Sequence, residues 1–308
     1  MIKKIYFIVK PNGQKKIKSL KKVIFTEASK YNFEFKILNS THKGHAILLA
    51  RKSVDEKANA VIACGGDGTI NEIAGVLMGK KIPLGIIPMG SGNGIAGHFN
   101  IPSNLSEAIK IIIKGYDVKI DVGNFNEKYF LGNLGFGFES TFIKHYNKKG
   151  LHGLYAYILA FFKAINSFNY PKLKVEWEGN FKELRPLVLL FSNLNQQGYN
   201  LTLTPNAKSN DGNFEMICIE RTNIFKILKF LVFVFQRKEI KSKEIFRLSF
   251  SKMKISNLQD EAIEYEIDGE FFKTHKKSHE IRVFNEKLSL IVPENLFYNI
   301  TKNKKALR

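Results

Sequence analysis

The octet Gly65-Gly66-Asp67-Gly68-Thr69-Ile70-Asn71-Glu72 is the strongest candidate for chemistry in this sequence. It follows an apolar run, Ala60 to Cys64, that predicts a strand, and it opens an apolar-periodic segment that predicts a helix as far as Leu77. A glycine-rich turn between strand and helix lets backbone N–H groups and the positive end of the helix approach a phosphate closely. The octet therefore predicts a phosphate-binding loop.

The carboxylate inside this loop sets it apart from the commonest phosphate loops. The octet has neither the Gly-Lys-Ser/Thr of a Walker A loop nor the Gly-x-Gly-x-x-Gly spacing. Asp67 would repel a bare phosphate, so a bridging Mg²⁺ or a hydroxyl proton to be accepted would explain its presence. The alternative is a tight turn in which Asp67 serves only as a helix cap.

A second strand, turn and helix follow directly. The predicted strand Leu84 to Pro88 runs into Met89-Gly90-Ser91-Gly92-Asn93-Gly94, where small residues crowd the strand's end. The Ser91 hydroxyl and the Asn93 amide are suited to phosphate or ribose oxygens. Two such turns on neighbouring strands converge on one crevice, which is where open α/β sheets bind ligands.

Two different patterns divide the chain. The first 115 residues alternate short apolar strands with helical segments, which is typical of a parallel α/β sheet covered on both faces. From residue 118 strands dominate, and only 151–166 and 223–236 read as helices. We therefore expect an N-terminal α/β domain over 1–116 and a β-rich, antiparallel domain over 117–308, with a closing strand pair at 280–292 and a frayed basic tail at 301–308.

Composition limits the classes of protein to which the chain can belong. The 308 residues are 44% hydrophobic, and two cysteines, Cys64 and Cys218, lie within apolar runs, which favours a globular protein of a reducing compartment. The net charge is +20, but only seven basic residues are arginine, so reading of nucleic-acid bases is not expected. An anionic substrate, an anionic membrane surface or general drift toward lysine would each account for the charge.

Five pieces in order resemble the diacylglycerol kinase catalytic-domain family, specifically its bacterial soluble lipid kinases with sphingosine-kinase-like members. Besides the octet and the Pro88-x-Gly90-Ser91-x-Asn93 turn, they are Thr41-His42-Lys43-Gly44-His45-Ala46, Pro205 to Gly212, and Ile267-Asp268-Gly269-Glu270. The resemblance runs from Ile5 to Val292. It implies an α/β fold of the NAD-kinase and diacylglycerol-kinase type, with an N-terminal parallel-sheet nucleotide-binding domain and a C-terminal antiparallel β-rich domain.

The family's functional residues map onto this chain position by position. ATP would be held by Lys10, Pro11, Asn12, Gly13, Thr41, Gly65, Gly66, Asp67, Gly68, Thr69, Asn71, Glu72, Gly90, Ser91 and Asn93. The catalytic residues would be Asp67, Asp268 and Glu270, with Asp268 and Glu270 activating the acceptor and Asp67 acting through Mg²⁺. A structural Mg²⁺ would be held by Lys208, Asp211 and Asn213. The chain departs from the family pattern at Lys10, His45, Gly94 and Asn210.

The function expected from these residues is a cytoplasmic, ATP- and Mg²⁺-dependent lipid kinase that phosphorylates a hydroxyl of a membrane lipid such as diacylglycerol. The apolar, lysine-bearing segment 224–235 favours peripheral attachment to an anionic membrane, although it also suits packing on a sheet. We expect no nucleic-acid partner and allow for a homodimer. Two alternatives stay open: an NAD-kinase-like small-molecule kinase, and a non-catalytic nucleotide or lipid sensor of the same fold.

Overall fold

A computed structural model gives the structure of the chain. It describes residues 3–10, 14–90, 92–147, 154–196, 202–222, 224–236, 242–284 and 287–306. Two compact units are present, Met1–Ile120 together with Glu286–Arg308, and Asp121–Asn285. Each unit is described by itself.

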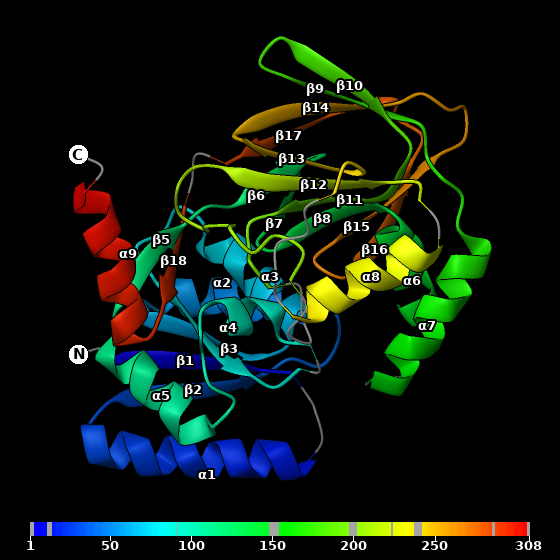
Figure 1. The fold of residues 1–308 in the computed structure, drawn as a ribbon. Helices are drawn as coiled ribbons and strands as arrows, with labels where there is room; N and C mark the ends of the chain where they lie inside the picture. Colours follow the sequence, from blue (N-terminus) through cyan, green and yellow to red (C-terminus); the bar gives the residue numbers. More distant parts are fainter. Residues whose placement is uncertain are drawn as a thin grey trace. The chain divides into compact units, whose positions relative to one another are not determined.

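The first unit is built on a six-stranded sheet in the order β2-β1-β3-β4-β18-β5 (Figure 1). All neighbours are parallel except β18 and β5, which are antiparallel. The strands are β1 (Lys4–Val9), β2 (Glu34–Asn39), β3 (Ala60–Gly65), β4 (Leu84–Pro88), β5 (Asp117–Ile120) and β18 (Leu288–Ile291). The helices are α1 (Gln14–Tyr31), α2 (His45–Asp55), α3 (Asp67–Leu77), α4 (Gly94–His98), α5 (Leu105–Lys114) and α9 (Glu294–Ala306).

Helices cover both faces of this sheet, which explains why its strands are apolar on both sides. On one face, Leu20 and Ile24 of α1 and Ile109 and Ile112 of α5 pack with alternate residues of β1 and β3. In Figure 1 the helices α2, α3 and α4 lie on the other side of the sheet from α1 and α5. The predicted parallel-sheet nucleotide-binding fold is confirmed for this unit.

The second unit is a sandwich of two six-stranded antiparallel sheets, as predicted for a β-rich domain. Their orders are β10-β9-β14-β17-β6-β7 and β13-β12-β11-β8-β15-β16. The first contains β6 (Gly123–Phe125), β7 (Lys128–Phe130), β9 (Leu173–Trp177), β10 (Asn180–Leu184), β14 (Lys252–Asn257) and β17 (Ser278–Val283). The second contains β8 (Asn133–Gly137), β11 (Pro186–Ser192), β12 (Phe214–Glu220), β13 (Ile245–Phe250), β15 (Ile263–Ile267) and β16 (Glu270–Thr274).

One hydrophobic core joins the two sheets of the sandwich. Phe125, Val175 and Ile281 come from one sheet, and Phe136 and Phe191 from the other. Aromatic rings meet edge to face here, with Phe125 and Phe136 5.6 Å apart. The helices of this unit are α6 (Phe138–Asn147), α7 (Leu154–Ser167) and α8 (Ile224–Phe235).

The C-terminal segment differs from the sequence-based expectation. The residues 280–292 do not form a closing strand pair, because β17 belongs to the sandwich and β18 inserts between β4 and β5 of the first sheet. All four residues of β18 are buried, as suits an interior strand covered on both faces. The first unit thus includes the chain's end, and the domain division at 116/117 is wrong for residues 286–308.

The basic tail is also not a frayed end as far as the structure describes it. Residues 294–306 form α9, and Phe297 packs on Tyr116 with ring centroids 5.2 Å apart. An ion pair of 2.7 Å joins Glu294 in its first turn to Lys114 at the end of α5. Sequence reasoning also missed α6, although Phe138, Phe142 and Tyr146 stack along one face of it at helical spacing.

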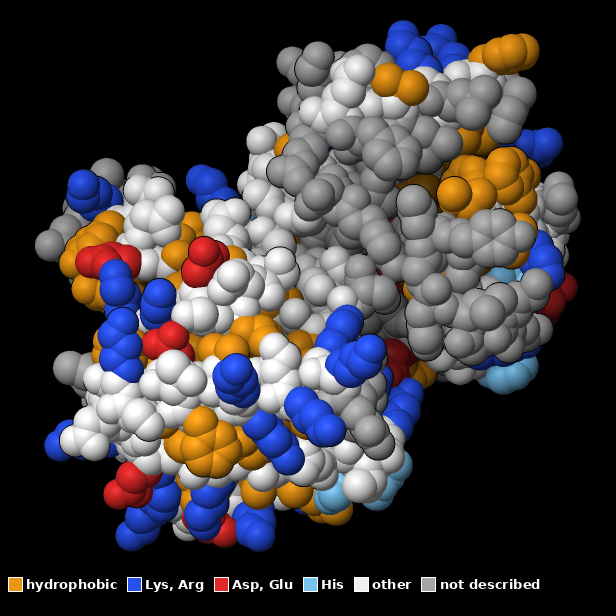
Figure 2. Space-filling model, turned by 90° about the horizontal axis from the view of Figure 1, so that it is seen from below, with side chains coloured by type: hydrophobic (Ala, Val, Ile, Leu, Met, Phe, Trp, Pro, Cys, Tyr) orange, Lys and Arg blue, Asp and Glu red, His pale blue; other side chains and the backbone are white. Residues whose placement is uncertain are grey.

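On the face that α1 covers, positive charge is spread over many places rather than gathered in one groove. In the view of Figure 2, basic side chains stand in many separate places over the face that α1 covers. The helix itself carries six lysines, at 15, 16, 18, 21, 22 and 30. A dispersed charge of this kind suits diffuse attraction to an anionic surface better than the tracking of one nucleic-acid strand.

Candidate active site

The octet occupies the turn between β3 and the N-terminus of α3, as the sequence predicts. Gly65 ends the strand, Gly66 caps the helix, and the amides of Thr69 and Ile70 donate to the Gly66 carbonyl at 2.9 and 3.2 Å. The amides of Asp67 and Gly68 come before the first amide that is hydrogen-bonded within the helix. Amides at this position of a helix bind phosphate readily. A Cβ built on Gly68 would meet nothing within 4 Å, so its missing side chain leaves open space over these amides.

The two glycine turns touch each other. The Met89 amide donates to the Gly65 carbonyl at 2.9 Å, and a Cβ on Gly90 would lie 2.6 Å from the Cα of Gly66. Asn93 adopts the left-handed region, with φ of 48°, and its side chain bonds both the N–H and the carbonyl of Gly90, at 3.0 and 2.9 Å. Only glycine at 66 and 90 allows the two backbones to come this close.

Asp67 ties the second turn to the first. One carboxylate oxygen accepts from the Gly94 amide at 3.0 Å and the other accepts from the Ile95 amide at 3.2 Å. Desolvation raises the pKa of Asp67, while these two backbone hydrogen bonds act in the opposite direction. The carboxylate has a structural role in addition to any catalytic one, since the amides that it bonds belong to the neighbouring turn.

Glu72 has a similar structural role further along α3. Its two carboxylate oxygens accept from the amides of Gly44 and Ala46, at 2.9 and 3.2 Å. This fixes the start of α2, whose cap residue Gly44 has a φ of 85°. Thr41, just before it, has its hydroxyl 2.9 Å from Nδ1 of His42 and 3.0 Å from Nδ1 of His45.

The structure brings the predicted nucleotide-binding segments to one edge of the first sheet. Lys10 follows β1, Thr41 follows β2, Gly66 follows β3 and Gly90 follows β4, and these four strands are adjacent and parallel. Thr69 is buried against Gly65, and Asn71 is half-buried in α3. Pro11, Asn12, Gly13 and Ser91 lie outside the described residues.

In the second unit, Asp268 and Glu270 occupy the hairpin between β15 and β16. Asp268 has a φ of 47°, and its carboxylate accepts from three amides, those of Leu131, Gly132 and Asn133, at 2.8 to 2.9 Å. Glu270, the first residue of β16, pairs with Ile267 across the hairpin and is half-buried. Asp268 therefore holds the loop that leads into β8, and Glu270 begins the returning strand.

The predicted metal residues lie in a turn that packs on Asp121. Asp211 accepts from the Asn213 amide at 3.0 Å, and Lys208 is exposed just before it. Sequence reasoning missed Asp121, which is fully buried and accepts from the Gly212 amide at 2.8 Å. The only signal for Asp121 in the sequence was its place, an acidic residue close to the point where alternating strands and helices give way to strands alone.

The donor set in this turn fits Mg²⁺ by its chemistry, because carboxylate and backbone carbonyl oxygens are the ligands this ion prefers. The described residues contain no cluster of three or more His, Cys, Asp or Glu side chains arranged for a metal. Asp211 is the one carboxylate among the three residues predicted to hold this ion.

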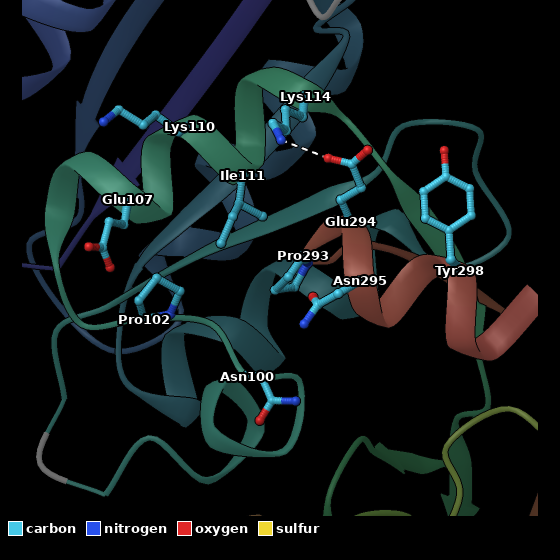
Figure 3. Close-up of a pocket in the computed structure, with 10 residues that line it drawn as sticks. All are labelled: Asn100, Pro102, Glu107, Lys110, Ile111, Lys114, Pro293, Glu294, Asn295 and Tyr298. Atoms are coloured by element: carbon cyan, nitrogen blue, oxygen red, sulfur yellow. Dashed lines mark hydrogen bonds and ion pairs between the residues drawn. The ribbon is translucent and has the colours of Figure 1, made fainter.

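One surface cavity, of about 780 Å³, lies elsewhere in the first unit (Figure 3). It runs between α5 and α9, and the Lys114–Glu294 ion pair stands at its wall. None of the residues predicted to bind nucleotide lines it. It is thus distinct from the edge where the glycine turns meet.

Comparison with known proteins agrees with this geometry. The diacylglycerol kinase catalytic domain model matches residues 4–125, and a model described as the YegS C-terminal NAD kinase beta sandwich-like domain matches 132–292. This chain belongs to the diacylglycerol kinase catalytic-domain family. The family confirms the predicted class of enzyme, an ATP-using phosphotransferase that acts on an alcohol group of a lipid.

Individual relatives support the same assignment. Diacylglycerol kinases of Staphylococcus aureus strains RF122 and JH9 are 29% and 28% identical over 233 residues, which are 74% of this chain and 73% of theirs. A solved diacylglycerol kinase of Bacillus anthracis has a TM-score of 0.75 at 20% identity, over 96% of this chain and 98% of that one. An NAD kinase of Archaeoglobus fulgidus in complex with ATP has a TM-score of 0.54 at 12% identity, over 97% of both chains. The two structures share the fold with this family member.

Replacing Gly90 by alanine should disrupt the contact between the two turns. The new Cβ would press on the Gly66 backbone, which cannot give way, so we expect a loss of about 1–3 kcal/mol in the free energy of unfolding and weaker ATP binding. Gly68→Ala is the matched control for stability, because alanine has space there and favours the helix. Urea unfolding and calorimetric titration with ATP measure both quantities.

The Gly68→Ala variant also tests where phosphate binds. If phosphate lies over Gly68, this variant weakens ATP binding at least tenfold without loss of stability, and unchanged affinity would contradict that position.

Replacing Glu72 by alanine should loosen the start of α2. The amides of Gly44 and Ala46 lose their acceptor, which costs about 1–3 kcal/mol in unfolding free energy. Glu72→Gln keeps one good acceptor oxygen and should lose less. Hydrogen exchange of the Ala46 amide reports the effect locally, and equal protection in all three proteins would show that this hydrogen bond does not hold α2.

Proposed function

We propose that this family member transfers the γ-phosphoryl group of ATP to the free hydroxyl of a diacylglycerol-type lipid at the surface of an anionic membrane. The observation that carries the proposal is the meeting of two glycine turns at the carboxyl edge of four parallel strands, with Asp67 between them. This arrangement supplies backbone amides for phosphate and one carboxylate beside them. It also lies within the part of the chain that matches the diacylglycerol kinase catalytic domain.

In this proposal the first unit binds and orients the nucleotide. The first-turn amides of α3 and the Gly90 to Asn93 turn hold phosphate oxygens, and Thr41 and Lys10 lie at the same sheet edge. Mg²⁺ at Asp67 would neutralise charge that develops on the transferred phosphoryl group. Phosphoryl transfer relies mainly on such positioning and charge stabilisation.

The second unit acts on the acceptor. Glu270 accepts the proton of the lipid hydroxyl, the hydroxyl oxygen forms the new bond to the γ-phosphorus, and the bond from that phosphorus to the leaving oxygen of ADP breaks. Asp268 is a positioning residue, because its carboxylate is occupied by three backbone amides. Asp211 and its neighbours would hold a structural Mg²⁺ that fixes the turn packed on Asp121.

Exposed apolar side chains on α7 and α8 support the membrane part of the proposal. On α8, Phe225 is 80% exposed and Val232 is 54% exposed, while Phe230 is buried against β11 and β12. On α7, Phe162 is 60% exposed. The buried side of α8 packs on the sandwich and that of α7 packs on α6, and helices that also expose aromatic and aliphatic side chains beside lysines suit insertion into the headgroup region of a bilayer. Among the described residues no helix is long and apolar enough to cross a membrane.

Transfer of labelled phosphate from ATP to diacylglycerol tests the chemistry. Asp67→Asn and Glu270→Gln should each lower kcat by about 10²–10⁴-fold, the usual cost of losing a general base or a charge-bearing group at the reacting atoms. Glu280→Gln, an exposed member of an ion pair on β17, is the control and should leave kcat unchanged. Full activity of both variants would overturn the mechanism, and phosphorylation of NAD but of no lipid would identify an NAD kinase instead.

Flotation with lipid vesicles tests the membrane surface. Phe225→Ser should reduce binding to phosphatidylglycerol vesicles at least fivefold, because burial of one aromatic ring is lost. Phe181→Ser is the matched control, since Phe181 is 65% exposed on β10, away from both helices in the sequence. Equal loss in both variants, or equal binding to neutral phosphatidylcholine vesicles by the unmodified protein, would contradict docking through α8 on an anionic surface.

A further inference from the structure

A second pair of carboxyl groups lies beneath the Asp268–Glu270 turn. Glu139 stands in the first turn of α6 and Glu266 in β15, and both face the same small space beside Gly135. A Cβ built on Gly135 would lie 2.4 Å from Oε2 of Glu139 and 2.9 Å from Oε1 of Glu266. Glycine at this position in β8 is what allows the two carboxyl groups to approach each other.

Among the described residues neither carboxyl group has an ion-pair partner, and the one hydrogen bond to the pair is that from the Gly269 amide to Glu266. Glu266 is 5% exposed, and Oε2 of Glu139 is buried without a hydrogen-bond partner among the described residues. The nearest lysine on α6, Lys144, is paired with Glu264 at 2.5 Å. The charged and titratable groups on the elements packed around the pair are Lys144, His145, Tyr146, Lys163, Glu264, Tyr265, Asp268, Glu270 and Lys273.

Burial and proximity have the same effect on both carboxyl groups. Desolvation raises the pKa of Glu266 to about 8, and the charge of Asp268 contributes. Desolvation, with the charge of Glu266, raises the pKa of Glu139 well above its ordinary value. Oε2 of Glu139 and the side chain of Glu266 are both buried beside Gly135, so ionisation of one carboxyl group disfavours ionisation of the other, and both effects favour the protonated form.

Glu266 connects this pair to the acceptor hairpin. Its Oε2 accepts a hydrogen bond of 2.8 Å from the Gly269 amide, which lies between Asp268 and Glu270. Gly269 has a φ of 83° and is exposed at the tip of the turn. Its amide is nevertheless held by the Glu266 side chain through this hydrogen bond. The orientation of Glu270 thus depends on where the Glu266 carboxyl group sits.

We propose that Glu139 and Glu266 form a protonated carboxyl pair that positions the Asp268–Gly269–Glu270 turn for proton transfer from the acceptor. The positioning role rests on the function proposed above for Glu270. The pair itself does not, because it follows from the contacts around Gly135 and Gly269. Loss of the retained proton would leave two like charges in one buried space, and their repulsion would displace the Glu266 carboxyl group against the attraction of the Gly269 amide.

Thermal unfolding as a function of pH tests the pair without reference to activity. A buried acid with a raised pKa binds a proton in the folded chain that the unfolded chain has already lost, so folding stability falls as pH rises from about 4.5 to about 8 and then levels off. Glu266→Gln and Glu139→Gln cannot ionise at that site, so their melting temperatures should fall a few degrees less than that of the unmodified protein between pH 5 and pH 8.5. Glu264→Gln is the matched control on the same strand, β15, and should follow the unmodified protein. Identical slopes in all four proteins would overturn the proposal.

Infrared spectroscopy observes the retained proton directly. The C=O stretch of a protonated carboxylic acid should be present at pH 7 in the unmodified protein and in Glu264→Gln, and should weaken in Glu139→Gln and Glu266→Gln. Absence of that band at pH 7 in the unmodified protein would contradict a protonated pair. A band of unchanged strength in both Gln variants would assign the proton elsewhere and do the same.

Kinetics separate the positioning role from a merely structural one. Glu266→Ala removes the acceptor of the Gly269 amide, so kcat for lipid phosphorylation at pH 7 should fall about tenfold, while KM for ATP stays unchanged because the nucleotide contacts are in the first unit. Glu266→Gln keeps an acceptor oxygen and should restore most of kcat and flatten its decline between pH 7 and pH 9. Unchanged kcat in Glu266→Ala would remove the positioning role, and a rise in KM for ATP would point to a general loss of structure. If no lipid is phosphorylated at all, the proposed function fails while the stability and infrared results still decide the pair.

Discussion

The contact between the two glycine turns is the constraint on which the nucleotide-binding edge depends. Gly66 and Gly90 bring two backbones within van der Waals distance, and the Asp67 carboxylate then bonds two amides of the second turn. The Asp67 hydrogen bonds depend on the close approach of the two turns, because without it the carboxylate could not reach those amides. The result is a rigid edge in which strand ends, helix N-terminus and carboxylate are set before any ligand arrives, which lowers the entropy that binding must overcome.

Acidic side chains accept hydrogen bonds from backbone amides at several turns and helix starts of this protein. Asp67 holds the start of α4, Glu72 the start of α2, Asp121 the Gly212 turn, Asp268 the loop before β8, and Glu266 the tip of the acceptor hairpin. A carboxylate that accepts backbone N–H bonds replaces water at groups that the fold would otherwise leave unpaired. Loops that carry chemistry are thereby fixed by hydrogen bonds from backbone amides to side-chain carboxyl groups.

Sequence patterns predicted the elements that depend on local signals and missed those that depend on distant partners. The bounds His45–Asp55 and Leu84–Pro88 follow from periodicity and burial alone, and the structure has the same bounds. By contrast, 280–292 resembles a hairpin in sequence, yet β18 joins a sheet whose other strands lie some 170 residues and more before it, and no local pattern encodes that return. In the site, motif glycines were predictable because phosphate needs them. Asp121, Glu139 and Glu266 stood outside any motif, and their roles are visible only in contacts with residues of other segments.

These contacts give the two acids of the Asp-Gly-Glu motif different roles. The sequence of the motif alone could not distinguish those roles. A general base needs a lone pair aimed at the substrate proton. Asp268 already accepts three amide hydrogens, and moving it would release the loop of residues 131–133, so its carboxylate is poorly suited to that step. Glu270 is the first residue of β16, and its backbone is held by the pairing with Ile267 and by the Gly269 contact beside it. The geometry thus separates the two acids: the first acid of the motif fixes the turn, and the second stands at the start of the returning strand.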